Sequence, residues 1–161
     1  MKPAQRAAGP RPAETGEVAI VAGSIVQGAL VGAWLALFPE TALRAGGFPP
    51  APAFFVRFAG VLHVLLAAGY ALEFTRFRRV TLLVIAKGVT AFFLAAAWVG
   101  EGLPWLMVAA VFIEAALASA AALVHPAANR SRLARARLRL VTPAPGEVRR
   151  VDHRRGGGNG A

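Results

Sequence analysis

Four polar residues stand inside otherwise apolar stretches of the sequence: Gln27, His63, Lys87 and Glu114. Side chains of these types can carry protons, hold ions or hydrogen-bond a polar ligand. Counted from the same end of four predicted helices, they lie about nine, nine, seven and ten residues in. At a rise of about 1.5 Å per residue they fall within one helical turn of each other in height. The sequence therefore predicts a single polar layer.

Small residues recur at four-residue spacing on the faces that carry or adjoin these polar groups, and small residues mark faces where membrane helices approach closely. The rows are Ser24, Gly28 and Gly32; Ala59, Ala67 and Ala71; Ala91 and Ala95; and Ala110, Ala118 and Ala122. We therefore expect all four polar groups to face inward. An unpaired lysine or carboxylate at mid-bilayer costs about 2.5 to 3.5 kcal/mol, which predicts a buried salt bridge between Lys87 and Glu114.

Gln27 and His63 are expected to satisfy the remaining donors and acceptors of this pair. Tyr70, two turns from His63 on the same side, extends the predicted network. Two interpretations stay open: the layer fixes helix register and partner choice, or it lines a proton or ion path or holds a polar ligand. The sequence shows no serine, histidine and acid set, metal-ligand spacing or phosphate loop, so we assign no catalytic residue and no metal site and favour a non-catalytic protein.

Four apolar segments must position this layer. Each has about 20 residues, enough to cross a hydrocarbon core of about 30 Å. Hydrophobic residues make up 57% of the 161-residue chain, above the roughly 45 to 50% that is typical of soluble domains. The predicted fold class is all-α, an integral membrane four-helix bundle with helices at 18–38, 54–72, 80–99 and 103–124.

The predicted organisation is a flexible cytoplasmic tail at 1–16, the transmembrane bundle at 17–125, and a basic, largely disordered cytoplasmic tail at 126–161. Residues 39–52 are rich in proline and glycine, which predicts a loop without regular structure. Residues 73–79 are predicted to form a short basic turn. Residues 100–102 leave room only for a tight hairpin between the last two helices.

Positive charges are distributed unequally about the predicted spans. The two tails and the turn at 73–79 carry nearly all of the 18 Lys and Arg residues, whereas the opposite side holds only Arg44 and Arg57. The positive-inside rule then predicts that both termini of a multi-pass membrane protein are cytoplasmic. Trp34, Trp98 and Trp105 all fall at the opposite end, where an aromatic belt is expected.

The formal net charge of +10 is expected to serve contact with anionic lipid headgroups of the bilayer and not with nucleic acid, because the charges flank the spans. A membrane-protein partner or a homo-oligomer is also left open. The chain has no cysteine, which excludes iron-sulfur ligation and covalent c-type haem. The arginines predicted to contact the membrane surface are Arg76, Arg78, Arg79, Arg130, Arg132, Arg135, Arg137 and Arg139.

Several features follow one another between residues 57 and 124. Arg57-Phe58-Ala59-Gly60 opens a predicted helix, Gly69-Tyr70 lies near its end, and an arginine-rich turn follows at 76–79. Lys87 lies within the third helix, Pro104 opens the fourth, and Glu114 lies within the fourth. This order resembles small bacterial four-helix membrane proteins of the DoxX-like group, although Glu114 stands where Asp is more often expected. The resemblance implies a four-helix bundle, a place in a bacterial inner membrane and, for some relatives, association with membrane redox complexes that use quinones. It supplies no catalytic residue.

Three functional hypotheses follow. The first is an accessory or structural subunit whose core is held by Lys87 and Glu114. The second is a redox-accessory subunit in which His63, Tyr70, Lys87 and Glu114 hold a quinone or a similar small ligand. The third is a small proton or solute carrier acting as an oligomer, since four helices alone leave little room for alternating access.

Overall fold

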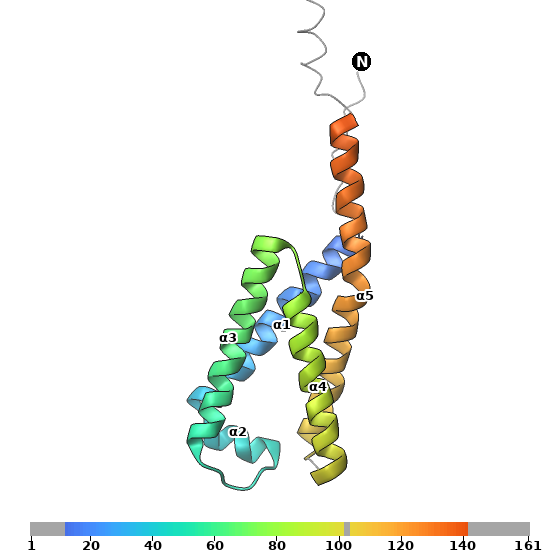
Figure 1. The fold of residues 1–161 in the computed structure, drawn as a ribbon. Coiled ribbons are helices and arrows are strands. Elements are labelled where there is room, and N and C mark those ends of the chain that lie inside the picture. Colours follow the sequence, from blue (N-terminus) through green and yellow to red (C-terminus); the bar gives the residue numbers. More distant parts are fainter. Residues whose placement is uncertain (1–11, 102–103, 142–161) are drawn as a thin grey trace, which may run out of the picture.

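The computed structural model describes residues 12–101 and 104–141, and the regular structure in these ranges is entirely helical (Figure 1). Four helices are long and apolar enough to cross a membrane, and a fifth is short. The prediction of a helical protein with four apolar spans is therefore confirmed. The helices are α1 (Pro12–Leu37), α2 (Pro39–Gly46), α3 (Ala53–Phe77), α4 (Thr81–Glu101) and α5 (Trp105–Val141).

Along the apolar stretches of the long helices, large apolar side chains face outward, whereas Lys87 and Glu114 lie inside. Phe92, Phe93 and Phe112 are exposed by 76%, 67% and 66%, but Lys87 and Glu114 by only 4% and 8%. In water this distribution would expose a large apolar area and bury ionised groups, both at a cost in free energy. Among lipid tails, exposed apolar side chains carry no such cost, so the distribution suits a bilayer.

The long helices form two antiparallel pairs, α1 with α3 and α4 with α5. Helix α1 also packs along α5, whereas α3 and α4 make few contacts with each other. Figure 1 shows α3 and α4 close together at the turn that joins them and apart at their other ends, near α2. The contact between α1 and α5 therefore holds the two pairs together.

Glycines bring the backbones of α1 and α3 into direct contact. A Cβ atom on Gly60 would lie 2.5 Å from the Ala36 nitrogen and 2.6 Å from the Gly32 oxygen, and a Cβ on Gly32 would lie 2.7 Å from the Gly60 oxygen. These distances are too short for any side chain. The predicted face of small residues on α1 is thus used for packing within the chain.

Helix α2 corrects the prediction of an irregular loop at 39–52. Pro39 opens the helix, where its missing N–H costs nothing, and Gly47 has a φ of 73°, the left-handed conformation that ends many helices. The Gly47 N–H donates to the Arg44 carbonyl and the Phe48 N–H to the Leu43 carbonyl, which is the Schellman motif. Proline and glycine therefore mark the two ends of a helix here.

Helices α1 and α5 both extend beyond their predicted ends, toward the same end of the bundle (Figure 1). The tail predicted at 1–16 is wrong for residues 12–16, and the tail predicted from 126 is wrong for residues 126–141. Pro126 lies inside α5 without ending it. The two extensions pack together: Ala128 is completely buried, and a Cβ on Gly16 would contact Val124. The rest of the two predicted tails lies outside the described residues.

Helix α3 continues to Phe77, through most of the predicted turn at 73–79. Arg78 then adopts the left-handed conformation, with a φ of 52°, and its N–H donates to the Phe74 carbonyl. The side chain of Glu73 accepts a hydrogen bond of 3.0 Å from the Leu82 N–H in the first turn of α4. A carboxylate suits this position because the first N–H groups of a helix lack partners within it.

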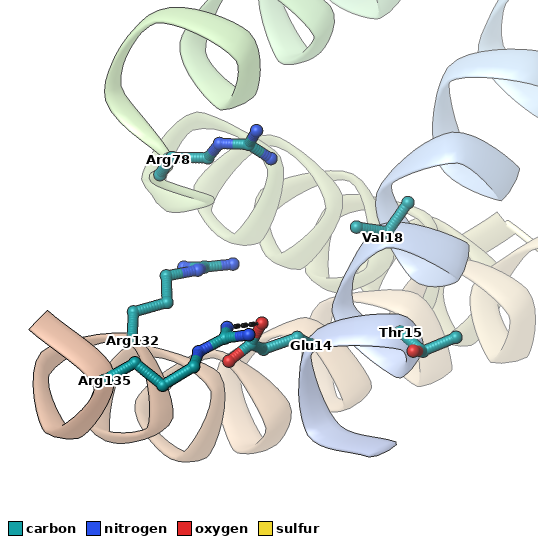
Figure 2. Close-up of a pocket in the computed structure, with 6 residues that line it drawn as sticks. All are labelled: Glu14, Thr15, Val18, Arg78, Arg132 and Arg135. Atoms are coloured by element: carbon teal, nitrogen blue, oxygen red, sulfur yellow. Dashed lines mark hydrogen bonds and ion pairs between the residues drawn. The ribbon is translucent and has the colours of Figure 1, made fainter. Parts of the chain in front are cut away.

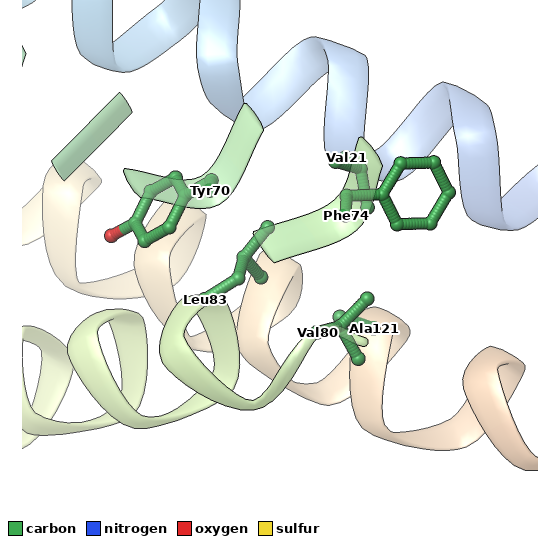
Figure 3. Close-up of a cluster of buried hydrophobic side chains, with 6 residues drawn as sticks. All are labelled: Val21, Tyr70, Phe74, Val80, Leu83 and Ala121. Atoms are coloured by element: carbon green, nitrogen blue, oxygen red, sulfur yellow. The ribbon is translucent and has the colours of Figure 1, made fainter. Parts of the chain in front are cut away.

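A cluster of buried apolar side chains closes the bundle near the turn between α3 and α4 (Figure 3). We call this the arginine-rich end, because Arg78, Arg79 and the α5 extension lie there. All four long helices contribute, so the core concentrates where the two helix pairs converge. The cluster consists of Val21, Tyr70, Phe74, Val80, Leu83 and Ala121.

Candidate functional site

Three polar side chains from three helices form a closed ring of hydrogen bonds, which we call the polar ring: Gln27 on α1, Lys87 on α4 and Glu114 on α5. The Lys87 Nζ donates to Gln27 Oε1 and to Glu114 Oε2, each at 2.7 Å. The Gln27 Nε2 donates to Glu114 Oε1 at 2.9 Å. Each residue is thus bonded to the other two.

The polar ring confirms the predicted salt bridge between Lys87 and Glu114, whose side chains are exposed by only 5% and 10%. Attraction between opposite charges is strong where little water screens them, but desolvation opposes it. Hydrogen bonds to both partners offset part of that cost, and Gln27 supplies one to each. Because Gln27 lies on α1, the ring also joins the α4–α5 pair to the α1–α3 pair.

His63 on α3 takes a different partner from the one expected. Its Nδ1 lies 2.9 Å from the Ala59 carbonyl oxygen, one turn earlier in the same helix. A carbonyl oxygen can only accept, so Nδ1 carries the hydrogen and Nε2 of a neutral ring is an acceptor. No hydrogen bond joins His63 to the polar ring among the described residues. Helix α3 therefore contributes no hydrogen-bonding side chain to it.

Tyr70 lies in the apolar cluster at the arginine-rich end and is 5% exposed. Its ring packs at the edge of this cluster, and Figure 3 shows the hydroxyl pointing away from Phe74 and Ala121. No hydrogen bond from this hydroxyl is found within the described part of the chain. Tyr70 is thus part of the apolar core. Its place in the polar network stays a prediction.

A second group of charged residues lies at the arginine-rich end, where α1 begins and α5 extends. Glu17 is 1% exposed; its carboxylate lies 2.5 Å from His125 Nδ1 and also accepts a hydrogen bond from Arg132. Glu14, one turn earlier, pairs with Arg135. This cluster is not predicted from the sequence, because the composition of residues 12–16 and 126–141 is typical of tails. Its signal is the spacing, since Glu14 and Glu17 are three apart and His125 and Arg132 seven apart.

An open pocket of about 490 Å³ adjoins this cluster (Figure 2). It gathers three of the eight arginines predicted at the membrane surface. Of the others, Arg76, Arg79, Arg130 and Arg137 are exposed, and the side chain of Arg139 lies outside the described residues. The residues that line the pocket are Glu14, Thr15, Val18, Arg78, Arg132 and Arg135.

Comparisons of the chain with protein-family models, with curated proteins and with solved structures find no match. Within residues 12–101 and 104–141, no group of three or more His, Asp and Glu side chains is placed to hold a metal ion. The function is therefore inferred from the polar ring and from the distribution of charge.

Proposed function

We propose that the chain is a non-catalytic multi-pass protein of the bacterial inner membrane, acting as an accessory or structural subunit with both termini in the cytoplasm. The observation that carries this proposal is the closed polar ring. Both oxygens of Glu114 and both polar atoms of Gln27 are already bonded within the ring, as is Lys87 through two of its hydrogens. The hydrogen-bonding groups of the polar ring are therefore used to hold the helices together, which favours a structural role.

A ligand at this level would have to break the ring before it could bind. Breaking a buried ion pair costs about 3 to 5 kcal/mol, which a small headgroup would have to recover from new contacts. No ring residue lines the pocket in Figure 2. None lines a second, smaller pocket of about 260 Å³ either, whose lining is Val80, Thr81, Val84, Ile85, Ala122 and His125. Both points favour the structural role over the quinone-binding and carrier hypotheses.

The proposed orientation rests on the arginines. Arg76, Arg78 and Arg79 lie at the same end of the bundle as the α5 extension, and Arg44 on α2 lies at the other. Trp98 and Trp105 lie at the end of the bundle opposite the arginines and are exposed by 43% and 72%, as expected of an interfacial belt. The likeness to DoxX-like proteins stays a prediction.

The direct test is purification of the tagged chain in a mild detergent, followed by mass spectrometry of the proteins and small molecules that stay bound. We expect a protein partner near equal stoichiometry and no quinone. His63→Ala, which leaves the polar ring intact, is expected to retain that partner. A quinone bound by the wild-type chain and lost in His63→Ala would overturn the proposal in favour of a redox-accessory role.

A further inference from the structure

The pocket at the arginine-rich end has an excess of positive charge and unused hydrogen-bonding atoms. Its lining contains Arg78, Arg132 and Arg135 but only one carboxylate, that of Glu14. Arg135 pairs with Glu14, and Arg132 binds the buried Glu17 through one of its two terminal nitrogens. The other terminal nitrogen of Arg132 is buried without a hydrogen-bond partner in the described part of the chain.

Arg78 supplies further unused donors. Its guanidinium lies 5.2 Å from the centre of the Phe74 ring, a cation–π contact, and none of the ion pairs in the described residues includes it. Figure 2 shows Arg78 and Arg132 extending from different segments toward α1, and both line the same pocket. Two guanidinium groups that line one pocket suit a phosphate, because each offers a planar fork of N–H donors.

The pocket also offers an acceptor. One carboxylate oxygen of Glu14 is buried without a partner among the described residues, and the next residue, Thr15, also lines the pocket. A carboxylate repels a free phosphate ion, but it accepts a hydrogen bond from a hydroxyl group. The pocket therefore suits a ligand that carries a phosphate and hydroxyl donors a few ångströms apart.

The height of the pocket points to lipid as the source of that ligand. Twenty helical residues span about 30 Å, so a span that starts at Trp105 reaches the other boundary near His125. Arg132 then stands about 10 Å beyond it, and helix side chains tilt back toward the N-terminus of their helix, here toward the membrane. The headgroup region extends about 5 to 8 Å beyond the hydrocarbon, and Val18, which lines the pocket, is 46% exposed.

We infer that this pocket binds the headgroup of an anionic phospholipid that carries hydroxyl groups, such as phosphatidylglycerol. The phosphate lies between Arg78 and Arg132, and a glycerol hydroxyl donates to Glu14. An acyl chain of the same lipid runs along Val18 and the apolar surface below it. Arg135 holds Glu14 in place and adds to the positive potential.

The test is native mass spectrometry of the full chain in detergent with equal amounts of phosphatidylglycerol and phosphatidylcholine. We expect the wild-type chain to retain one phosphatidylglycerol with a preference of about tenfold or more, the size expected for one charge-assisted hydrogen bond. Arg78→Ala should remove most of this preference. Arg79→Ala is the matched control, because Arg79 is the next residue, is exposed and does not line the pocket, and it should change the preference less than twofold.

Arg78→Lys keeps the charge without the fork and should fall between wild type and Arg78→Ala, so it serves if the alanine variant fails to fold. Equal loss in Arg78→Ala and Arg79→Ala would overturn the inference, since it would indicate general surface charge. Equal retention of the two lipids by the wild-type chain would do the same. Displacement of phosphatidylglycerol by millimolar inorganic phosphate would show a soluble-phosphate site in place of a lipid site.

Discussion

Reversal of the charges tests the ion pair of Lys87 and Glu114. Lys87→Glu and Glu114→Lys each replace the ion pair of 2.7 Å by two like charges in a buried site, and each should lower the free energy of unfolding by at least about 3 to 5 kcal/mol. The double variant restores opposite charges and should recover a large part of this loss. Thermal unfolding in detergent, with expression level as a second readout, measures the effect. A double variant no more stable than the worse single variant would contradict the pairing.

Lys87 shows which residue contacts can be predicted from the sequence. Its bond to Glu114 follows from equal depth on the two arms of a hairpin and from the cost of leaving either charge alone. A hydrogen bond from Gln27 to this pair is predicted, but not that Gln27 bonds to both partners. His63 has the same depth, yet its own helix offers a carbonyl one turn away. Depth alone cannot distinguish a local acceptor from one on another helix.

Replacement of the third ring member separates the polar ring from His63. Gln27→Leu removes one bond from Lys87 and one from Glu114 and should cost about 1 to 3 kcal/mol. His63→Leu removes only a bond within α3 and should cost less. Both are measured by unfolding in the same detergent. If His63→Leu were the more damaging change, α3 would contribute to the ring in a way that the hydrogen bonds do not show.

At the scale of the helices, the effect of a proline or glycine depends on its position, so composition predicts a loop at 39–52 and a tail from 126 where the structure has helices. Pro39 and Gly47 bound α2, whereas Pro126 lies inside α5. Proline is accepted in a first turn and breaks one backbone bond elsewhere, which other contacts can offset. Around Pro126 those contacts come from α1, through Glu17 to His125 and Arg132. Such support comes from a distant part of the chain and is not visible in local composition.

The contact between α1 and α3 predicts that equal substitutions at different glycines have unequal effects. Gly60→Ala would place a Cβ 2.5 Å from the backbone of Ala36 and should lower the free energy of unfolding by about 1 to 3 kcal/mol or more. Gly88→Ala meets nothing within 4 Å and should be neutral or stabilising by up to about 1 kcal/mol. Equal thermal stability of the two variants would show that α1 and α3 do not meet at Gly60.

Mutual support between the two extensions predicts an effect of shortening the chain. A stop after residue 128 removes Arg132 and Arg135, so Glu14 and Glu17 lose their ion pairs. The backbone amides in the first turns of α1 should then exchange with deuterium faster by an order of magnitude or more, since each lost pair contributes to closing that segment. A stop after residue 141 keeps both arginines and is the control. Unchanged exchange after the shorter stop would contradict the packing.

For the molecule as a whole, the distribution of polarity was predictable, whereas the arrangement of helices was not. Four apolar segments with one polar group each require inward polar faces and outward apolar ones, and the structure has both. Which helices touch depends on side-chain fit between distant segments, and the sequence gives no measure of it. The close crossing of α1 with α3 and the weak contact of α3 with α4 therefore come from the structure alone.

The proposed orientation can be tested in whole cells because the chain has no cysteine. Ala45→Cys on α2 and Thr75→Cys near the end of α3 each introduce one exposed thiol, at opposite ends of the bundle. A membrane-impermeant maleimide added outside spheroplasts should label the cysteine at position 45 and not that at 75. Lysis should make both reactive. The reverse pattern would place the arginines outside.

The salt bridge inside the α4–α5 pair bears on how the chain enters the membrane during synthesis. Lys87 and Glu114 lie on neighbouring spans, so the second helix pair contains both members of its own ion pair. Helix α4 alone would carry an uncompensated charge into lipid, at about 2.5 to 3.5 kcal/mol. Insertion of the two spans together as a hairpin avoids that cost. Helix α4 is therefore expected to wait at the translocon until α5 has left the ribosome.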